Sequence, residues 1–592
     1  MTADVLRIAN CSGFYGDRQS AAREMVTDGP IDVLTGDYLA ELTMLILWKS
    51  SRKNPEADGY ATTFYRQMEE VLGLCVERGI KIVTNAGGLN PTALAARLRD
   101  LASRLGIDVR IARVTGDDLV PSLTELRRAG ERFFNLDTTR PLEDGQPVAT
   151  ANAYLGGWGI AAALKRGADV VVTGRVTDAA LCVGPAAWHF GWATDDWNQL
   201  AGAVVAGHVI ECGPQATGGN YSFFEEIPDL RRPGFPIAEI RRDGSSIITK
   251  HPGTGGVVTS GTVTAQLLYE IGHPLYLNPD VTTDFRTIRL AEEAADRVAI
   301  SGVRGYPPPS SLKVAMTLEA GWRNSVEFIL TGLAIEAKAA VLEAALLNGV
   351  GGSEQYEKYR AELTRTDRPD APSNDLASAT MRFTVSSPDP DLVGRRFSGA
   401  ATALALGNYP GLYLAGPPQN ATSAGRYWPT TVSRDLVHHE VVDDAGARLS
   451  VLPDPRVSNP DEIAPEQTDV PPWSCDCPTS RVPLGTIVGA RSGDKGGDAN
   501  LGVWTRDGSG FAWLCEWLTV NQLRETVPDC DDLPIQRYEL TNLNALNFVI
   551  KGLLGSGVAA AERRDAQAKS LGEYLRSRLA DIPECLLNNG HN

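Results

Sequence analysis

Residues 80–91, IKIVTNAGGLNP, end a short apolar run with two adjacent glycines and lead into a helical pattern at 92–106. Gly87 and Gly88 let the backbone turn sharply and come close to a ligand. Asn90 or a neighbouring threonine can cap the helix, whose N-terminus favours an anion. The stretch predicts a strand, a tight turn and a helix, and leaves open whether the turn also binds a ligand.

The same combination recurs along the first half of the chain. Apolar runs of strand length alternate with helical periodicity, as at 60–79, where Gly79 is expected to end the helix. This order predicts a large doubly wound, mostly parallel sheet over residues 1–290. The carboxyl ends of parallel strands meet at one edge, where ligands bind. The glycine-rich turns there supply predicted substrate-binding residues: Asn10, Ser12, Gly36, Asp37, Asn85, Gly87, Gly88, Asn90, Gly174, Arg175 and Asp178.

The pattern of predicted strands and helices changes after about residue 290. A hairpin pattern at 287–305 and a helical pattern at 332–349 predict an α+β sandwich over 291–450. Frequent prolines from 451 to 483 remove hydrogen-bond donors and break periodicity, which predicts a linker. Residues 484–592 are enough for one small α+β domain.

Length and charge limit the classes of function. A chain of 592 residues is expected to form two to four domains. A formal charge of −17 argues against a protein that binds duplex nucleic acid. The first residues lack the basic flank of a secretory signal, and the apolar stretch around Glu41 is shorter than a membrane span. We expect a cytoplasmic protein without membrane or nucleic-acid partners, and a homo-oligomer, the common case for soluble enzymes.

Cysteine and histidine positions give weak signals for metal. Nine scattered cysteines fit reduced thiols better than a disulfide framework. Cys475 and Cys477 form a C-x-C pair, but two thiolates lack the other two ligands of a tetrahedral zinc site. His438 and His439 are adjacent and point apart on a strand. No metal site is predicted.

The densest group of reactive side chains lies in GHVIECGPQATGGNYSFF, residues 207–224. His208, Glu211 and Cys212 are the predicted catalytic residues, as a proton-transfer imidazole, its carboxylate partner or base, and a nucleophilic thiol. On a helix His208 and Glu211 share a face, and the Gly-Pro pair that follows ends the helix. The alternative is a His–Glu hydrogen bond that fixes the loop, beside a packed thiol.

Neighbouring loops add polar groups on flexible backbone. The loop around Thr254 lacks the third glycine of a dinucleotide fingerprint, because Val258 occupies that position, and GDKGGD lacks the spacing of a Walker A loop. No NAD binding or ATP hydrolysis is predicted. Arg491 and Lys495, flanked by glycines, could grip a phosphate or carboxylate or could form a solvated hairpin. The further predicted binding residues are Gln215, Thr217, Gly219, Asn220, Thr254, Arg491 and Lys495.

Taken together, NCSGFYGDR, TNAGGLNP, GHVIECGPQATGGN and ARSGDKGGDANLGV resemble motifs of the acyclic terpene utilisation AtuA-like family. The resemblance covers nearly the whole chain. It implies a large N-terminal region followed by a C-terminal AtuA-like domain with a ferredoxin-like fold. Members are encoded with acyl-CoA carboxylases, acyl-CoA dehydrogenases and enoyl-CoA hydratases of branched terpenoid acid breakdown.

That setting implies an acyl-CoA thioester or small carboxylic acid as ligand, with CoA as part of the substrate and no other cofactor. We expect an enzyme of the hydratase, dehydratase or carbon–carbon lyase type. The alternative is a non-catalytic binding or assembly subunit beside a biotin-dependent acyl-CoA carboxylase. Convergence of His208, Glu211 and Asn85 within hydrogen-bond reach would favour the enzyme, and their separation by more than a side chain's length would favour the subunit. The early turns and residues 208–220 are expected to form one pocket.

Overall fold

The computed structural model describes residues 4–52, 59–464, 470 and 472–587. Three segments named in the sequence analysis extend beyond these ranges. They are the start of the chain at residues 1–3, the predicted linker at residues 465–469 and 471, and the predicted C-terminal domain at residues 588–592. The chain divides into two compact units: Met1–Thr317 with Tyr427–Val558 and Asp565–Asn592, and Leu318–Arg426 with Ala559–Arg564.

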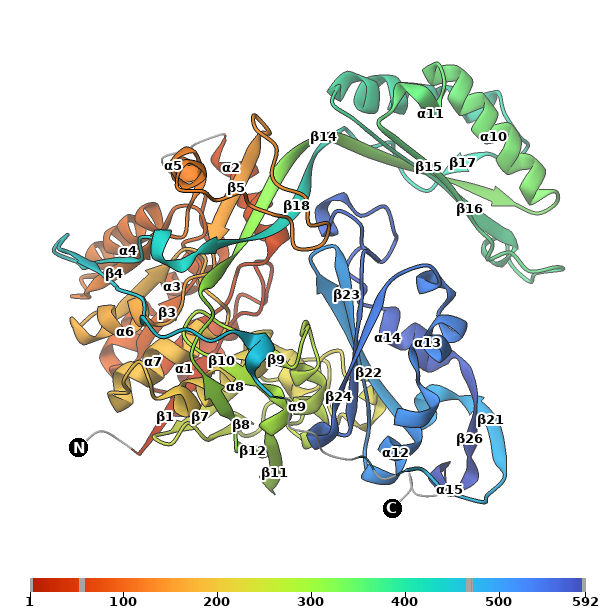
Figure 1. Ribbon diagram of the computed structural model, residues 1–592. Helices are drawn as coiled ribbons and strands as arrows, with labels where there is room; N and C mark the ends of the chain where they lie inside the picture. Colours follow the sequence, from red (N-terminus) through yellow and green to blue (C-terminus); the bar gives the residue numbers. More distant parts are fainter. Residues whose placement is uncertain (1–3, 53–58, 465–469, 471, 588–592) are drawn as a thin grey trace. The chain divides into compact units, whose positions relative to one another are not determined.

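One large sheet organises the N-terminal part of the first unit (Figure 1). Within the described residues it has eleven strands in the order β11-β12-β8-β7-β1-β2-β3-β6-β4-β19-β20. The strands in that order are Arg289–Ala294, Arg297–Ser301, Ser246–Lys250, Pro236–Arg241, Val5–Asn10, Val33–Gly36, Lys81–Thr84, Val170–Thr173, Ile111–Thr115, Glu440–Val442 and Arg448–Ser450. The central strands β1, β2, β3, β6 and β4 are parallel to one another.

The sheet is mixed, which corrects the prediction of a mostly parallel, doubly wound sheet. β7 and β8 form a hairpin that pairs antiparallel with β1, and β11 and β12 extend the same edge. The turn between β7 and β8 contains Asp243 and Gly244, and Gly244 has φ of +85°. Asp-Gly between two apolar runs is a hairpin signal, and so short a connection can join only antiparallel strands.

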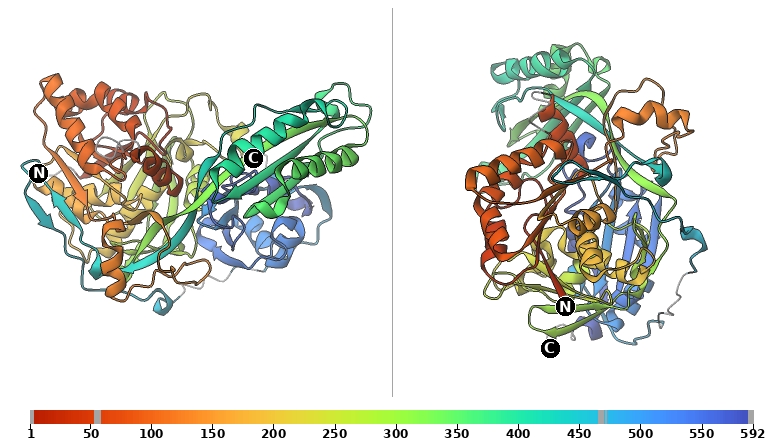
Figure 2. Two further views of the ribbon diagram at one scale, coloured as in Figure 1. Left: turned by 90° about the horizontal axis from the view of Figure 1, so that it is seen from above. Right: turned by 90° about the vertical axis from the view of Figure 1, so that its left-hand side faces the viewer.

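Two groups of helices cover the central strands (Figure 2). The first group is α1 (Ala21–Thr27), α3 (Thr62–Arg78) and α4 (Pro91–Leu105), and the second is α6 (Trp158–Lys165), α7 (Ala180–Phe190) and α8 (Trp197–Ile210). Val170 and Val172 of β6 pack in the core of the first group, while Val171 between them is also fully buried. Successive strand side chains point to opposite faces, so both faces of β6 are covered.

The Gly-Gly turn after β3 is held by close packing. Asn90 caps α4, with its side chain accepting a 3.0 Å hydrogen bond from the Ala93 amide. A Cβ atom on Gly87 would collide with the Thr173 carbonyl oxygen and with Pro91. Gly88 adopts a φ of +53°, which is unfavourable for other residues. The turn therefore needs glycine for its own packing against β6.

The second unit has its own sheet and core. Its strands β15 (Lys358–Thr364), β16 (Ser378–Ser387), part of β14 (Ser311–Thr331) and β17 (Tyr413–Leu414) are antiparallel. Helices α10 (Ile335–Val350) and α11 (Phe397–Ala403) pack on this sheet around Phe328 and Phe383. β14 and β18 (Thr422–Ser433) each begin in one unit and end in the other.

Residues 479–558 and 565–587 form a small α+β domain within the first unit. Its sheet has the order β22-β23-β25-β24, with all neighbours antiparallel: Val488–Lys495, Asp498–Thr505, Ala545–Ile550 and Ile535–Leu540. Helices α12 (Gly508–Trp517), α13 (Val520–Thr526) and α14 (Leu571–Ser577) share its core. A separate ribbon pairs β21 (Thr479–Pro483) with β26 (Leu579–Pro583), followed by α15 (Glu584–Leu587).

Buried hydrogen bonds join this small domain to the N-terminal part of the first unit. The Ser222 hydroxyl donates to the Ala490 carbonyl at 2.7 Å and accepts from the Ala490 amide at 2.9 Å. The Asn547 amide donates to the Gly272 carbonyl at 2.7 Å. These contacts hold the turn between β22 and β23 next to the N-terminal part of the first unit.

Replacing Gly87 with alanine tests the account of this turn. The added methyl group has no room beside Thr173 and Pro91, so we expect a loss of about 2 kcal/mol, typical of overpacking, and a lower thermal midpoint. Gly79→Ala is the control, because Gly79 has φ of +68° but open space, and costs about 1 kcal/mol for the strained backbone alone. Equal midpoints for the two variants would contradict the packing argument.

Candidate functional site

A cavity of about 530 Å³ lies within the first unit, between the N-terminal sheet and the small C-terminal domain. Its walls come from the loops after β2 and β6, the end of α8, residues 270–279, the start of β14 and the turn between β22 and β23. Ionisable side chains of both signs line it: Glu41, Asp137, Asp178, Glu211, Glu270, Asp494 and Asp498, with Arg175, Lys313, Lys495, Lys551, His208 and His273.

The end of α8 places His208 and Glu211 on the cavity wall. The two residues lie one turn apart, with His208 Nδ1 3.5 Å from Glu211 Oε1. Every residue from Leu200 to Ile210 is buried, because α8 packs against β7, β8 and α7. Gly213, with φ of +57°, turns the chain into a short 3₁₀ helix, so α8 ends where the sequence indicates.

Burial shifts the pKa values of both side chains toward their neutral forms. Burial, together with the nearby positive charge of Lys495, lowers the pKa of His208 to about 4. Burial raises the pKa of Glu211 far above its usual value, and the negative charges of Asp178, Asp37 and Glu270 add to the effect. The environment therefore favours an uncharged imidazole, which can accept a proton, beside a carboxylic acid group, which can donate one.

Several polar atoms of this pair are unsatisfied. Neither ring nitrogen of His208 nor Glu211 Oε2 has a hydrogen-bond partner of normal geometry among the described residues. Their side chains are only 1% and 7% exposed, so these atoms carry the full cost of desolvation. Buried polar atoms of this kind at a cavity wall mark a place where a polar ligand can be recognised.

An arginine and a tyrosine form the next part of the wall. Arg175 is buried and donates from Nη1 to Asp178 Oδ1 at 2.8 Å and to the Leu39 carbonyl at 3.0 Å. Its guanidinium lies 4.2 Å from the centre of the Tyr154 ring. Charge pairing and stacking together hold this cation in one position beside the cavity.

Lys313 and Glu41 continue the charged wall. Lys313 Nζ lies 4.9 Å from the Tyr154 ring centre and 3.8 Å from Glu41 Oε1. Burial alone would raise the pKa of Glu41, but the charges of Lys313 and Arg175 lower it to about 2. Glu41 is therefore held as an anion between two cations, whereas the surroundings of Glu211 favour its neutral form.

The C-terminal domain closes the cavity with the turn of its first hairpin. Lys495 Nζ donates to the Glu270 carbonyl oxygen at 2.6 Å and lies 5.7 Å from the Tyr276 ring centre. Burial and the charge of Lys313 lower the pKa of Lys495. Burial, Glu270 and Glu41 raise the pKa of Asp494 to about 7. The turn therefore contributes Asp494 and Lys495, whose pKa values depend on charged residues across the cavity.

Five residues predicted from the sequence line this cavity: His208, Glu211, Arg175, Asp178 and Lys495. Other predicted residues support them from behind. Asn10 Nδ2 donates to the carbonyl oxygens of Ile210 and Glu211, at 2.5 and 2.9 Å, and Asn10 Oδ1 accepts from the Ser12 amide at 2.6 Å. Asn10 and Ser12 therefore position the end of α8.

The loop after β2 is fixed by a second buried group. Asn85 accepts from the Tyr38 amide at 2.8 Å and donates to Asp37 Oδ1 at 2.6 Å. A Cβ atom on Gly36 would meet the Tyr38 ring, so Gly36 makes room for that side chain. These three predicted residues hold the loop that carries Glu41. Asn85 itself does not belong to the cavity lining among the described residues.

Three further glycines and a cap serve local packing. Gly87, Gly88 and Asn90 build the turn after β3, as described above. Gly174 leaves room for the Asp117 carboxylate, whose Oδ2 accepts from the Arg175 amide at 2.8 Å. Gly174 thereby fixes the backbone at Arg175.

The residues predicted around 215–220 and 254 form a separate arrangement. Gln215 accepts a hydrogen bond from Arg491, whose guanidinium lies 4.2 Å from the Tyr269 ring centre. The Thr217 hydroxyl bonds to the Pro214 and Gly234 carbonyls, and the Thr254 hydroxyl donates to the His251 carbonyl at 2.8 Å. Gly219 packs against Pro214, and Asn220 has φ of +59°. None of these described residues lines the cavity.

Cys212, the third predicted catalytic residue, is half-buried next to Glu211. Burial raises the pKa of its thiol, and the nearby acid Glu270 raises it further. Since the thiolate is the nucleophile, this environment disfavours nucleophilic chemistry at Cys212. Cys212 is also outside the described lining of the cavity.

Sequence reasoning missed several lining residues, among them Glu41, Tyr154, Glu270, Tyr276, Lys313, Asp494 and Lys551. Two had a local signal. Glu41 interrupts a long apolar stretch, and Lys313 lies between the buried residues Leu312 and Val314 in β14. A charge inside an apolar pattern indicates a special environment, because burying it without a partner is costly.

Comparison with protein families agrees with this arrangement. The family model described as acyclic terpene utilisation family protein AtuA matches residues 6–442, and the AtuA ferredoxin-like domain matches residues 482–579. The chain belongs to the AtuA family. Its C-terminal domain is the ferredoxin-like domain of that family. Both matched ranges contribute to the cavity, through His208 and Glu211 from the first and Lys495 from the second.

No curated protein and no solved structure matches the chain. Among the described residues, every helix is too short or too polar to cross a membrane.

The elevated pKa of Glu211 predicts a pH-dependent stability. Folding raises this pKa, so its contribution to stability is fully present below pH 4.5 and is lost as the pH rises through the folded pKa. Glu211→Gln removes the titration and keeps the shape. We expect the thermal midpoint of the variant to rise relative to the native protein between pH 5 and pH 9. A constant difference over that range would contradict a protonated Glu211.

Proposed function

We propose that this protein is an enzyme that acts on a branched acyl-CoA thioester or a related carboxylic acid derivative. His208 accepts a proton and Glu211 donates one, in a hydration, dehydration or carbon–carbon cleavage next to the acyl carbonyl. The observation that carries the proposal is the placement of His208 and Glu211, 3.5 Å apart at a cavity wall, both with buried polar atoms that lack a hydrogen-bond partner among the described residues. Burial favours the neutral form of each, which suits a proton acceptor beside a proton donor. Membership of the AtuA family supports a substrate from acyclic terpene breakdown.

The charges around this pair suit chemistry at a thioester. Removing a proton next to a thioester carbonyl, or adding water to a conjugated thioester, places negative charge on the carbonyl oxygen. Lys495 and Arg175 supply positive charge at the cavity wall, where low dielectric strengthens their effect. A cavity of about 530 Å³ is within the usual range for small-molecule sites, and it suits the branched acyl group.

The alternative of a non-catalytic assembly subunit makes a different prediction about this region. It expects a ligand-sized cleft without convergent titratable groups. The expected convergence of His208, Glu211 and Asn85 is met only in part. His208 and Glu211 lie 3.5 Å apart on the same cavity wall as Lys495, which supports the enzyme, whereas Asn85 lies outside the described lining and fixes the neighbouring loop.

Binding is tested first, by thermal shift with CoA, a β-methyl-branched enoyl-CoA thioester and the corresponding free acid. A ligand at a hundred times its dissociation constant stabilises by about 2.7 kcal/mol, so a clear shift with the thioester is expected. Lys495→Met should weaken binding by about 10-fold or more, because it removes a charged partner. Lys165→Met, at an exposed lysine of α6, is the matched control. No shift with any thioester would count against the proposal.

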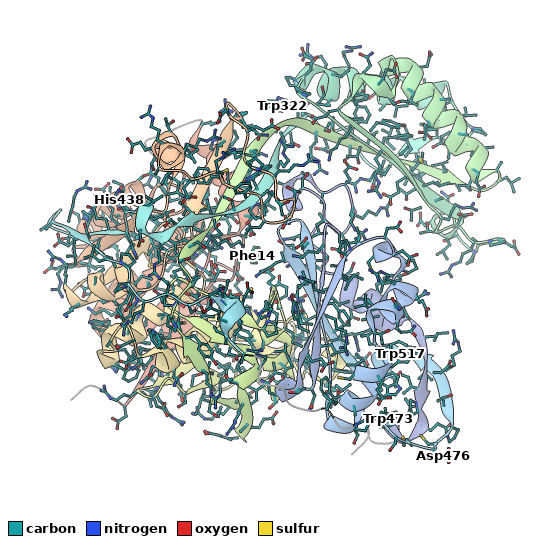
Figure 3. The ribbon with its side chains drawn as sticks, viewed as in Figure 1. Phe14, Trp322, His438, Trp473, Asp476 and Trp517 are labelled. Carbon is teal, nitrogen blue, oxygen red and sulfur yellow. The ribbon has the colours of Figure 1, made fainter. Side chains whose placement is uncertain are left out.

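Turnover is tested with variants of the pair. His208→Gln should lower kcat about 100-fold or more, as expected for loss of a general base, with little change in the thermal midpoint. Glu211→Gln should lower kcat similarly, since an amide is a very weak acid. His438→Gln, at the exposed histidine marked in Figure 3, and Cys212→Ser should retain turnover.

Two outcomes separate catalysis from a structural role. If His208→Gln lowers the midpoint by many degrees and affects turnover only in proportion to the folded fraction, the His208–Glu211 contact is structural. If the thioester binds but no variant or native protein converts it, the protein is a binding subunit.

A further inference from the structure

Three cysteines far apart in the sequence meet at one end of the C-terminal domain. Cys475 and Cys477 precede β21, and Cys585 follows β26. Cys585 Sγ lies 3.0 Å from the sulfur of each of the other two. All three sulfur atoms lie within 4.8 Å of one another. Among the described residues, no other group of at least three histidine, cysteine, aspartate or glutamate side chains has this metal-ligand spacing.

Backbone pairing accounts for two of the three positions. β21 and β26 are antiparallel, with Thr479 opposite Pro583. The Glu584 amide donates to the Pro478 carbonyl at 2.9 Å, which continues the ladder by one step. The chain then enters α15 (Glu584–Leu587), whose second residue is Cys585. The end of the ribbon therefore brings Cys585 next to Cys477, with 3.0 Å between their sulfur atoms.

The spacing of the C-x-C pair accounts for the third position. Cys475 and Cys477 are two residues apart, and the sulfur of each lies 3.0 Å from that of Cys585. Asp476 between them is exposed, and Figure 3 shows it at the edge of the domain. The three cysteines meet where the segment before β21 and the helix after β26 lie together at the end of the ribbon.

The three thiols are accessible. Cys475 is exposed, and Cys477 and Cys585 are half-buried. Thiolate sulfur is a preferred ligand of zinc, and accessible thiols allow an ion to enter from solvent.

We propose that Cys475, Cys477 and Cys585 bind one zinc ion, with a fourth ligand from solvent. Zinc binds thiolate sulfur at about 2.3 Å, so tetrahedral geometry needs sulfur separations of about 3.8 Å, less than 1 Å wider than the contacts at Cys585. Binding replaces the three thiol protons, which are released to solvent, and no electron is transferred.

A zinc ion fits this cluster better than a disulfide does. A disulfide uses two sulfurs and leaves the third unexplained, whereas Cys585 is equally close to both partners. The ion would join the chain before β21 to the chain after β26, and so would fasten the two ends of the ferredoxin-like domain. The cluster lies outside both ranges matched by the family models, so the site is a property of the flanking residues.

The test uses the full-length protein, reduced, treated with chelator and then titrated with Zn²⁺ or Co²⁺. We expect about one ion per chain, the thiolate-to-cobalt absorption band of a cysteine site, and protection of three thiols from alkylation. Cys477→Ser and Cys585→Ser should each abolish the band and lower the zinc content to near background. Cys515→Ser, at a half-buried cysteine of the same domain outside the cluster, should leave both unchanged.

Two further measurements make a negative result decisive. Circular dichroism and the thermal midpoint show whether the serine variants remain folded, and zinc should raise the midpoint of the native protein only. If the folded, reduced protein binds no zinc and its three thiols stay equally reactive with and without the ion, the proposal is wrong. A disulfide between two of these cysteines in protein purified with zinc and without an oxidant would also overturn it.

Discussion

The cavity depends on a balance of buried charges that neither the N-terminal core nor the ferredoxin-like domain provides alone. Lys495 reaches from the hairpin turn of the small domain to the Glu270 carbonyl, close enough to His208 to lower its pKa. Lys313 and Arg175 hold Glu41 as an anion on another part of the wall. A buried charge without its partners would lower the free energy of unfolding by more than most single contacts raise it.

This balance gives two acidic residues on one cavity wall opposite pKa shifts. Cations lower the pKa of Glu41 despite its burial, whereas burial and other acids raise the pKa of Glu211. A raised carboxyl pKa beside a lowered imidazole pKa suits the proposed acid–base chemistry. The ranges matched by both family models contribute residues to this cavity.

Local signals made part of this structure predictable. The glycine pair and Asn90 identified the turn between β3 and α4, and the three-residue spacing of His208 and Glu211 placed them on one helix face. Long-range pairing was not predictable from such signals. Asp243 and Gly244 mark the β7–β8 hairpin locally, but no local pattern shows that β7 pairs antiparallel with β1 and so makes the sheet mixed. Lys313 and Cys585 meet their partners only because distant segments pair, which no local pattern encodes.

The most direct test of the central claim is the protonation state of Glu211. Infrared difference spectra between the native protein and Glu211→Gln should show the carbonyl stretch of a protonated carboxylic acid at pH 7. The band should persist in Lys495→Met, because removing a nearby cation can only raise the pKa of Glu211 further. A carboxylate band at pH 7, with no protonated carbonyl, would contradict the account of this site.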